Sequence, residues 1–236
     1  MLVIGKKNVV IATALFLTVL TFVLCFAALA KTDVIAAKSG VKVVLDAGHG
    51  GIDGGVKGVK TGTPESEINL SVVKKLETYL VSAGISVVLT RSSEAGLYGV
   101  ASSTLKRRDM QKRKEIIEKA EPTLVVSVHM NYYPNSTRRG GQVFYRAENE
   151  RSALLAKSVQ NGLNGLYEGV KDYAPLAGDY YILNCTEYPS VIAECGFLSN
   201  PEDENLLIQS EFQGEIAYSL FCGIINYLTE SSIAYF

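Results

Sequence analysis

Two histidines are the only imidazoles in this chain of 236 residues, and both follow apolar runs typical of buried strands. His49 lies just beyond the run at 41–46, and His129 lies just beyond the run at 123–128. Ligands in open α/β sheets bind beyond the carboxyl ends of the strands. Two imidazoles at such positions favour a metal site, and a catalytic zinc ion needs a third protein ligand and a fourth position for water.

The third ligand has several acidic candidates in the sequence: Asp46, Asp53, Glu65, Glu67 and Glu194. Helical geometry separates two of them, because a helix advances about 100° per residue. Glu65 lines up with Ile68 and Val72, on the apolar stripe that must face the sheet, whereas Glu67 lies on the opposite side. Glu65 also occupies the first turn, where a carboxylate suits the helix dipole. We therefore expect Glu65 to point inward and Glu67 to be solvated.

Two further acids suit supporting chemistry. Glu194 follows three apolar residues at the end of a strand expected to be central, where a carboxylate is costly unless it is paired or near a metal. Beside zinc it can take a proton from water and later donate it to a leaving amine. Asp46 precedes the glycine-rich turn, and we expect it to orient that turn or a ligand histidine from behind the site.

Other chemistries are poorly supported. The glycine-rich segment 48–55 lacks the G-K-[ST] ending of a phosphate loop, which argues against a nucleotide. The motifs H-E-x-x-H and G-x-S-x-G are both absent. Lysine plus arginine number 23 against 24 aspartate plus glutamate, so the charge balance gives no support to a nucleic-acid partner.

The elements that must position these residues alternate between strand and helix. Strands are expected at 41–46, 85–90, 123–128, 141–145, 180–183 and 191–193, and helices at 65–82, 107–120 and 152–166. Asn200 is expected to cap a helix that begins with Pro201, and Ser210 and Gln213 to form a capping box opening a last helix that runs to Leu228. The pattern predicts one α/β domain over 41–230, with a mostly parallel, twisted sheet covered by helices on both faces.

The first thirty residues have a different character. Lys6 and Lys7 precede an uncharged stretch from residue 8 to 30, long enough for the roughly 20 apolar residues that cross a bilayer. The stretch ends in Ala28-Leu-Ala30, a small-x-small pattern typical of signal-peptidase sites. A cleaved signal peptide and a membrane anchor both remain open, and both place the rest of the chain outside the cytoplasm. Residues 31–40 are expected to be a linker.

Three cysteines remain beyond this segment, Cys185, Cys195 and Cys222. Their number is odd and no C-x-x-C spacing occurs, so a disulfide framework or a cysteine-rich zinc site is poorly supported. We expect free thiols.

Five sequence motifs occur in an order that resembles the motif order of a known family. They are Leu45-Asp-Ala-Gly-His-Gly-Gly51, Glu65-Ser-Glu-Ile-Asn-Leu70, Leu89-Thr-Arg91, Ser127-Val-His-Met-Asn131 and Glu194-Cys-Gly-Phe-Leu-Ser-Asn200. Together they resemble the zinc-dependent N-acetylmuramoyl-L-alanine amidases of the third amidase class. The likeness runs from about residue 41 to 228 and implies the α/β fold of that family.

The resemblance implies one Zn²⁺ per chain, held by His49, Glu65 and His129, with Glu194 as the catalytic acid and base. It also implies peptidoglycan as the substrate, cut at the amide between the lactyl group of muramic acid and L-alanine. Zinc would polarise that carbonyl and activate water.

A short chain with one hydrophobic N-terminus and no wall-binding repeats looks like the sporulation amidases of the CwlD type. Those enzymes trim spore-cortex glycan so that muramic lactam can form, which germination requires. The resemblance thus implies a location at the forespore or cortex. The lack of a wall-binding module also suggests an activating partner protein that helps to order the zinc site.

Two alternatives remain open, and some residues have no settled role. The chain could be a zinc peptidase or carboxypeptidase acting elsewhere in the stem peptide, or a wall-binding module with little turnover. Arg91 and Arg113 match family positions, but surface or sheet-edge ion pairing explains them as well as substrate contact does. Tyr132, Tyr133 and the pair at 138–139 follow the His129 loop and could line a glycan groove.

Overall fold

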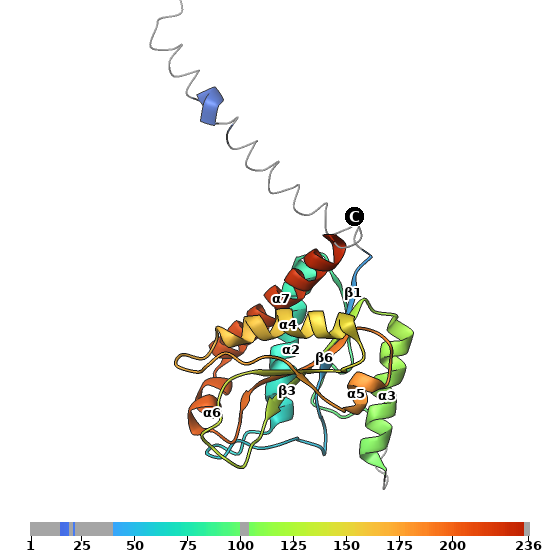
Figure 1. Ribbon diagram of the computed structural model, residues 1–236, viewed down its shortest axis with the longest axis vertical. Helices are drawn as coiled ribbons and strands as arrows, with labels where there is room; N and C mark the ends of the chain where they lie inside the picture. The colour runs from blue at the N-terminus through green and yellow to red at the C-terminus, as the bar shows by residue number, and fades with distance from the viewer. Residues whose placement is uncertain (1–14, 19–20, 22–39, 100–103, 234–236) are drawn as a thin grey trace, which may run out of the picture.

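The computed structural model describes residues 15–18, 21, 40–99 and 104–233 (Figure 1). The expected signal peptide or anchor at 1–30 and the linker at 31–40 lie almost wholly outside these residues. In the described part of the chain, no helix combines the length and the apolar character that a bilayer span requires.

A six-stranded sheet forms the centre of the domain, with the strand order β2-β1-β3-β6-β4-β5. Its strands are β1 (Lys42–Ala47), β2 (Ser86–Leu89), β3 (Leu124–Asn131), β4 (Gln142–Tyr145), β5 (Leu176–Ala177) and β6 (Ser190–Phe197). The pairings β2-β1, β1-β3 and β3-β6 are parallel, whereas β4 runs antiparallel to β6. The predicted single α/β domain with a mostly parallel sheet is confirmed.

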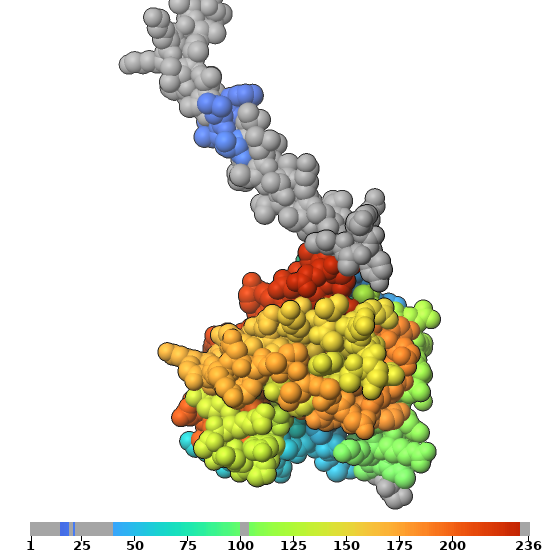
Figure 2. Space-filling model, viewed as in Figure 1, coloured from blue at the N-terminus to red at the C-terminus, as the bar shows by residue number. Residues whose placement is uncertain are grey.

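Helices cover both faces of this sheet, as expected for a parallel sheet (Figure 1). They are α2 (Glu65–Ser82), α3 (Leu105–Ala120), α4 (Glu150–Asn164), α5 (Tyr181–Asn184), α6 (Pro201–Leu207) and α7 (Ser210–Ile233). The larger apolar core lies between the sheet and α2, α4 and α7, and a smaller one lies between the sheet and α3 and α5. In Figure 2, the yellow and orange surface around α4 fills the middle of the viewed face, with red α7 above it.

Helix α2 forms where the apolar spacing predicts it. Ile68, Val72, Leu76 and Leu80 are buried against the sheet, which places Glu65 on the same inward face. Glu67 is exposed, as helical geometry predicts. Because the stripe fixes the rotation of the helix about its axis, the direction of the Glu65 side chain follows from core packing.

Two predicted local structures are wrong. The segment 180–183 is not a strand, because α5 occupies Tyr181–Asn184 and the amide of Asn184 donates to the carbonyl of Tyr180. Ile182 and Leu183 are both buried, and this short apolar run packs as one helical turn against β6 and α3 instead of joining the sheet. A run of this length does not distinguish a strand from a buried turn by its pattern.

The predicted capping box at the start of α7 is also absent. The Gln213 side chain accepts from Ser71 Oγ and donates to the Leu207 carbonyl, while Ser210 Oγ accepts from Lys75 Nζ. Both side chains therefore join α7 to its neighbours, and the helix continues past Leu228 to Ile233. The other predicted cap is confirmed, because Asn200 accepts from the amides of Glu202 and Asp203 ahead of Pro201.

Candidate metal centre

Strand register brings the candidate residues to one edge of the sheet. His129 of β3 pairs directly with Glu194 of β6, and the end of β1 at Ala47 pairs with Val128. Neighbouring strands lie about 5 Å apart, so paired residues on the same face are close. His49 comes two residues after β1, in the turn beside β3. The strands β3 and β6 extend further than predicted. His129 and Glu194 therefore lie inside these strands, near their carboxyl ends, and not beyond them.

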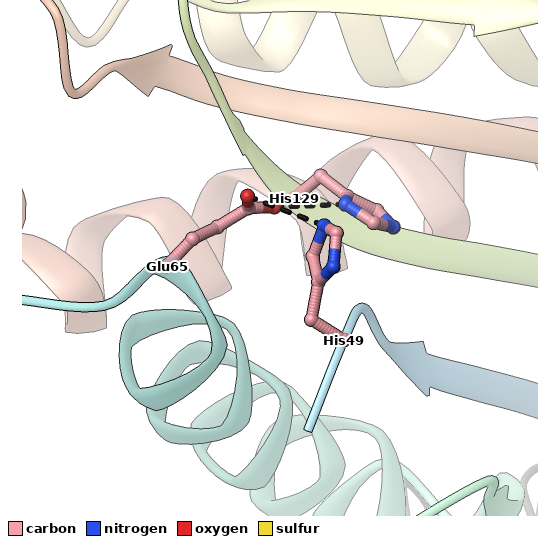
Figure 3. Close-up of side chains that lie close together, drawn as sticks. All are labelled: His49, Glu65 and His129. Carbon is pink, nitrogen blue, oxygen red and sulfur yellow. Dashed lines mark hydrogen bonds and ion pairs between the residues drawn. The ribbon is translucent and has the colours of Figure 1, made fainter. Parts of the chain in front are cut away.

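The two histidines converge on Glu65 at the start of α2 (Figure 3). His129 Nδ1 lies 2.8 Å from Glu65 Oε1, and His49 Nε2 lies 3.3 Å from Glu65 Oε2. The imidazole ring centres are 5.0 Å apart, and one ligand atom from each of the three residues falls within 4.8 Å of the others. The structure thus brings together the three predicted ligands, and this group could hold a metal ion.

The electrostatics of this group favour a cation. Burial alone would raise the pKa of Glu65, but hydrogen bonds and charge from His129 and His49 hold that pKa far below its ordinary value. Burial would lower the pKa of His49, yet Glu65 and Asp53 raise it to about 9, and Glu65 raises the pKa of His129 as well. A buried carboxylate that draws protons onto two imidazoles offers the same attraction to a metal ion.

Glu194 lies next to these candidate ligands. Its Oε2 atom is buried and has no hydrogen-bond partner among the described residues. Burial, assisted by the charge of Glu65, raises the pKa of Glu194 to about 7 against the opposing charges of His129 and His49. A carboxyl group with a pKa near neutrality can both accept and donate a proton.

A cavity of about 410 Å³ opens on this edge of the sheet. It is lined by His49, His129 and Glu194, by residues at the start of α3, and by Tyr180, Tyr181 and Ile182 around α5. The segment 180–183, which the sequence misassigned to the sheet, thus forms a wall of the site. Nothing in the sequence marks Tyr180 and Tyr181 as part of this cavity.

Asp46 was predicted to orient the glycine-rich turn or a histidine from behind the site. It does so indirectly, through Arg113. It accepts hydrogen bonds from Thr90 Oγ1 and Ser127 Oγ and forms a buried ion pair with Arg113. Arg113 in turn donates to the carbonyl of His49 over 2.7 Å. Burial would raise the pKa of Asp46, but Arg113 and the two hydroxyl groups lower it to about 2. Ion pairing was one of the two roles left open for Arg113, and its ion pair lies in the interior and not at the surface.

Two residues orient the ligands directly. Asp53 was one of the acidic candidates for the third ligand. A carboxylate oxygen of Asp53 lies 3.0 Å from His49 Nδ1, which leaves His49 Nε2 facing Glu65. Asn69 was missed; its Nδ2 donates to Glu65 Oε1 and to the carbonyl of Gly48. Its signal was a polar residue one helical turn after Glu65 on the buried stripe. Carboxylates and amides behind metal-binding histidines commonly set ring orientation.

The remaining sequence candidates lie elsewhere. Tyr132 and Tyr133 are exposed after β3 and do not line the cavity. Arg138 lies over the rings of Tyr133, Tyr173 and Phe197, and Arg139 pairs with Asp203. The cysteines Cys185, Cys195 and Cys222 are free, as expected.

Glycine is required at position 48 because a side chain there would overlap the His129 ring. We expect Gly48→Ala to move His129 away from Glu65 and to weaken metal binding at least about 10-fold, the usual cost of disturbing a ligand's surroundings. Equilibrium dialysis against zinc measures this effect. Gly214→Ala on α7 is the control, since a Cβ there meets nothing within 4 Å. Equal metal affinity in both variants would contradict the geometry described.

Comparison with known proteins agrees with this site. The family model of N-acetylmuramoyl-L-alanine amidase, Amidase_3, matches residues 43–226. The chain belongs to this amidase family. It is therefore an enzyme of a hydrolytic class, and the resemblance inferred from the five motifs is confirmed.

Three relatives of this amidase each match about four fifths of its chain. The germination-specific N-acetylmuramoyl-L-alanine amidase of Bacillus subtilis is 33% identical over 195 residues, which cover 81% of each chain. The CwlD amidase of Clostridioides difficile, solved in complex with the GerS lipoprotein, is 34% identical with a TM-score of 0.76, covering 80% of this chain and 99% of that one. The catalytic domain of CwlV from Bacillus (Paenibacillus) polymyxa is 28% identical with a TM-score of 0.70, covering 80% and 98%.

Proposed function

We propose that this amidase is a zinc enzyme that hydrolyses the amide between the lactyl group of N-acetylmuramic acid and L-alanine in peptidoglycan. The observation that carries the proposal is the convergence of His49, Glu65 and His129, with ligand atoms within 4.8 Å of one another. Beside them lies the buried Oε2 atom of Glu194, which has no hydrogen-bond partner among the described residues. Two imidazoles and one carboxylate are the ligand set of many catalytic zinc sites. In catalytic zinc sites with three protein ligands, the fourth position is available to water or substrate.

Each residue of the site has a proposed task. His49, Glu65 and His129 would hold the zinc ion, which would supply Lewis-acid polarisation of the scissile carbonyl and a lowered pKa of bound water. Glu194 accepts the proton of the attacking water and delivers it to the nitrogen of L-alanine as the amide bond breaks. Its raised pKa, about 7, suits both transfers. The lactyl carboxylate and the free amine of the stem peptide are the products.

The physiological role that we propose is trimming of spore-cortex peptidoglycan, needed for muramic lactam formation and germination. The name of the Bacillus subtilis relative, a germination-specific amidase, supports this role. We also propose export through the N-terminal hydrophobic segment, and action outside the cytoplasm at the forespore or cortex. The relative solved with the GerS lipoprotein supports the further proposal that a partner protein assists this amidase.

Product analysis tests the proposed bond. The zinc-loaded protein is incubated with purified spore-cortex peptidoglycan, and the soluble and insoluble products are identified by mass spectrometry. We expect stem peptides that begin with a free L-alanine amino group, together with muramic acid that carries no peptide. Stem fragments that leave L-alanine attached to muramic acid would instead identify a peptidase, and binding without any cleavage would identify a wall-binding module.

A further inference from the structure

Arg91 follows β2 and carries its positive charge in the interior. Its side chain is 4% exposed. Among the described residues it forms no ion pair, and its four hydrogen bonds all reach backbone carbonyls, those of Ala47, Gly48, Ser66 and Ser93. A buried charge that forms no ion pair is costly to maintain. The more distant charges of Asp46, Asp109 and Glu94 offset only part of the effect of burial on Arg91. The role of Arg91 should therefore lie in the backbone segments that its hydrogen bonds hold in place.

The carbonyls that Arg91 contacts lie next to two proposed metal ligands. Its Nη2 atom donates to the Gly48 carbonyl over 2.9 Å and to the Ser66 carbonyl over 2.8 Å. Gly48 immediately precedes His49, and Ser66 immediately follows Glu65. One nitrogen atom therefore joins the backbone of the turn that carries His49 to the first turn of α2, which carries Glu65. This bridge adds to the link that Asn69 makes between the Gly48 carbonyl and Glu65 Oε1.

Arg113 holds the other side of the same turn. Its Nη1 donates to the Ala47 carbonyl over 2.9 Å, and its Nη2 to the His49 carbonyl over 2.7 Å. Three successive carbonyls, at 47, 48 and 49, are thus taken up by two guanidinium groups. His49 has φ of 60°, in the left-handed region that residues other than glycine seldom adopt. A residue stays in that region only when its surroundings impose it.

The charge of Arg91 persists at neutral pH. Burial and the nearby charge of Arg113 lower the pKa of Arg91 to about 10, which still leaves it protonated. The planar guanidinium directs several donors at once, whereas lysine offers a single nitrogen. The lysine nitrogen lies one bond nearer the backbone than Nη2, and it cannot also replace the bonds that Nε and Nη1 make to the Ala47 and Ser93 carbonyls. Arg91→Lys therefore keeps a positive charge and weakens the bridge between the two ligand segments.

We propose that Arg91 is a positioning residue of the metal centre: it fixes the distance between the segments bearing His49 and Glu65, and thereby sets metal affinity, without touching metal or substrate. The proposal rests on the metal role assigned above to those two residues. A positioning role and a purely stabilising role of Arg91 predict different effects on metal binding, so an experiment can distinguish them.

The test is the zinc affinity of full-length Arg91→Lys, measured by competition with a chromophoric chelator. We expect the dissociation constant to rise about 10- to 100-fold, as for other residues that orient metal ligands. Because the ligands themselves remain, excess zinc should restore most of kcat. Arg139→Lys is the matched control: Arg139 likewise donates through Nε, in its case to the buried acid Asp203, and contacts neither ligand segment. Its zinc affinity should equal that of the wild type.

The outcomes are separable. Wild-type zinc affinity in Arg91→Lys, accompanied by a lower unfolding temperature of the metal-free protein, would make Arg91 merely structural and overturn the proposal. A wild-type protein that binds no zinc would instead overturn the metal role of the site. If Arg91→Lys does not fold, Arg91→Gln serves in its place, since it removes the buried charge and keeps an amide donor. It too should bind zinc more weakly than the wild type.

Discussion

Glu194→Gln is expected to lower amide hydrolysis by about 10²- to 10⁴-fold, the usual contribution of a general acid and base. Glutamine keeps the shape of the side chain but can neither accept the proton of water nor deliver one to the leaving amine. The buried Oε2 atom of Glu194 has no hydrogen-bond partner in the described residues, so the loss of the carboxyl group should not destabilise the fold. Release of stem peptides from peptidoglycan measures turnover, and elemental analysis measures zinc.

The variant should retain one zinc ion per chain, because Glu194 is not one of the proposed ligands. Glu202→Gln is the matched control, since Glu202 is an exposed acid on α6 that pairs with Arg139 outside the cavity. It should hydrolyse substrate at the wild-type rate. Substantial turnover by Glu194→Gln, or loss of zinc together with activity, would show that Glu194 has a different role from the one proposed.

Removing a proposed ligand is expected to have the largest effect of all. In His49→Ala, His129→Ala or Glu65→Ala, two ligands remain, which is too few for a stable zinc site. We therefore expect zinc content after dialysis to fall from about one ion per chain towards zero, and hydrolysis to fall below the level of Glu194→Gln. Inductively coupled plasma mass spectrometry measures the metal in each variant.

Helix α2 supplies an internal control for this experiment. Glu65 and Glu67 lie two residues apart in the same first turn, but Glu65 is buried against the histidines and Glu67 is exposed. Glu67→Ala should keep both zinc and activity. Retention of a full zinc ion in Glu65→Ala would exclude Glu65 as a ligand and would leave Asp53, which contacts His49, as the alternative.

The residues that meet in the site were predictable because strong local patterns position them. The apolar stripe of α2 fixes which way Glu65 points, and the apolar runs of β3 and β6 place His129 and Glu194 near the carboxyl ends of these strands. Parallel strands place their carboxyl ends at one edge, so side chains far apart in sequence were expected to meet there. The Asn200 cap followed from an equally local rule.

The features that escaped prediction depend on tertiary contacts. Nothing local distinguishes Tyr181–Asn184 from a short strand; its packing against α3 and β6 decides the matter. Ser210 and Gln213 have the sequence of a capping box, but partners on α2 and α6 compete successfully for their side chains.

Sequence patterns also gave no indication that Arg91 and Arg113 are buried. In sequence, a charged residue such as Arg91 or Arg113 is expected at the surface. Both are buried because the turn after β1 presents three carbonyls that need donors. That demand arises only once the turn is folded against β2 and α3, so no single segment reveals it.

Zinc K-edge X-ray absorption spectroscopy of the full-length protein, loaded with one equivalent of zinc, tests the central claim most directly. The account predicts a first shell of nitrogen and oxygen atoms at about 2.0–2.2 Å with the scattering pattern of two imidazoles. It also predicts that this spectrum is lost in His129→Ala. Sulfur scatterers at about 2.3 Å, or the same spectrum in His129→Ala, would place the metal elsewhere and contradict the account.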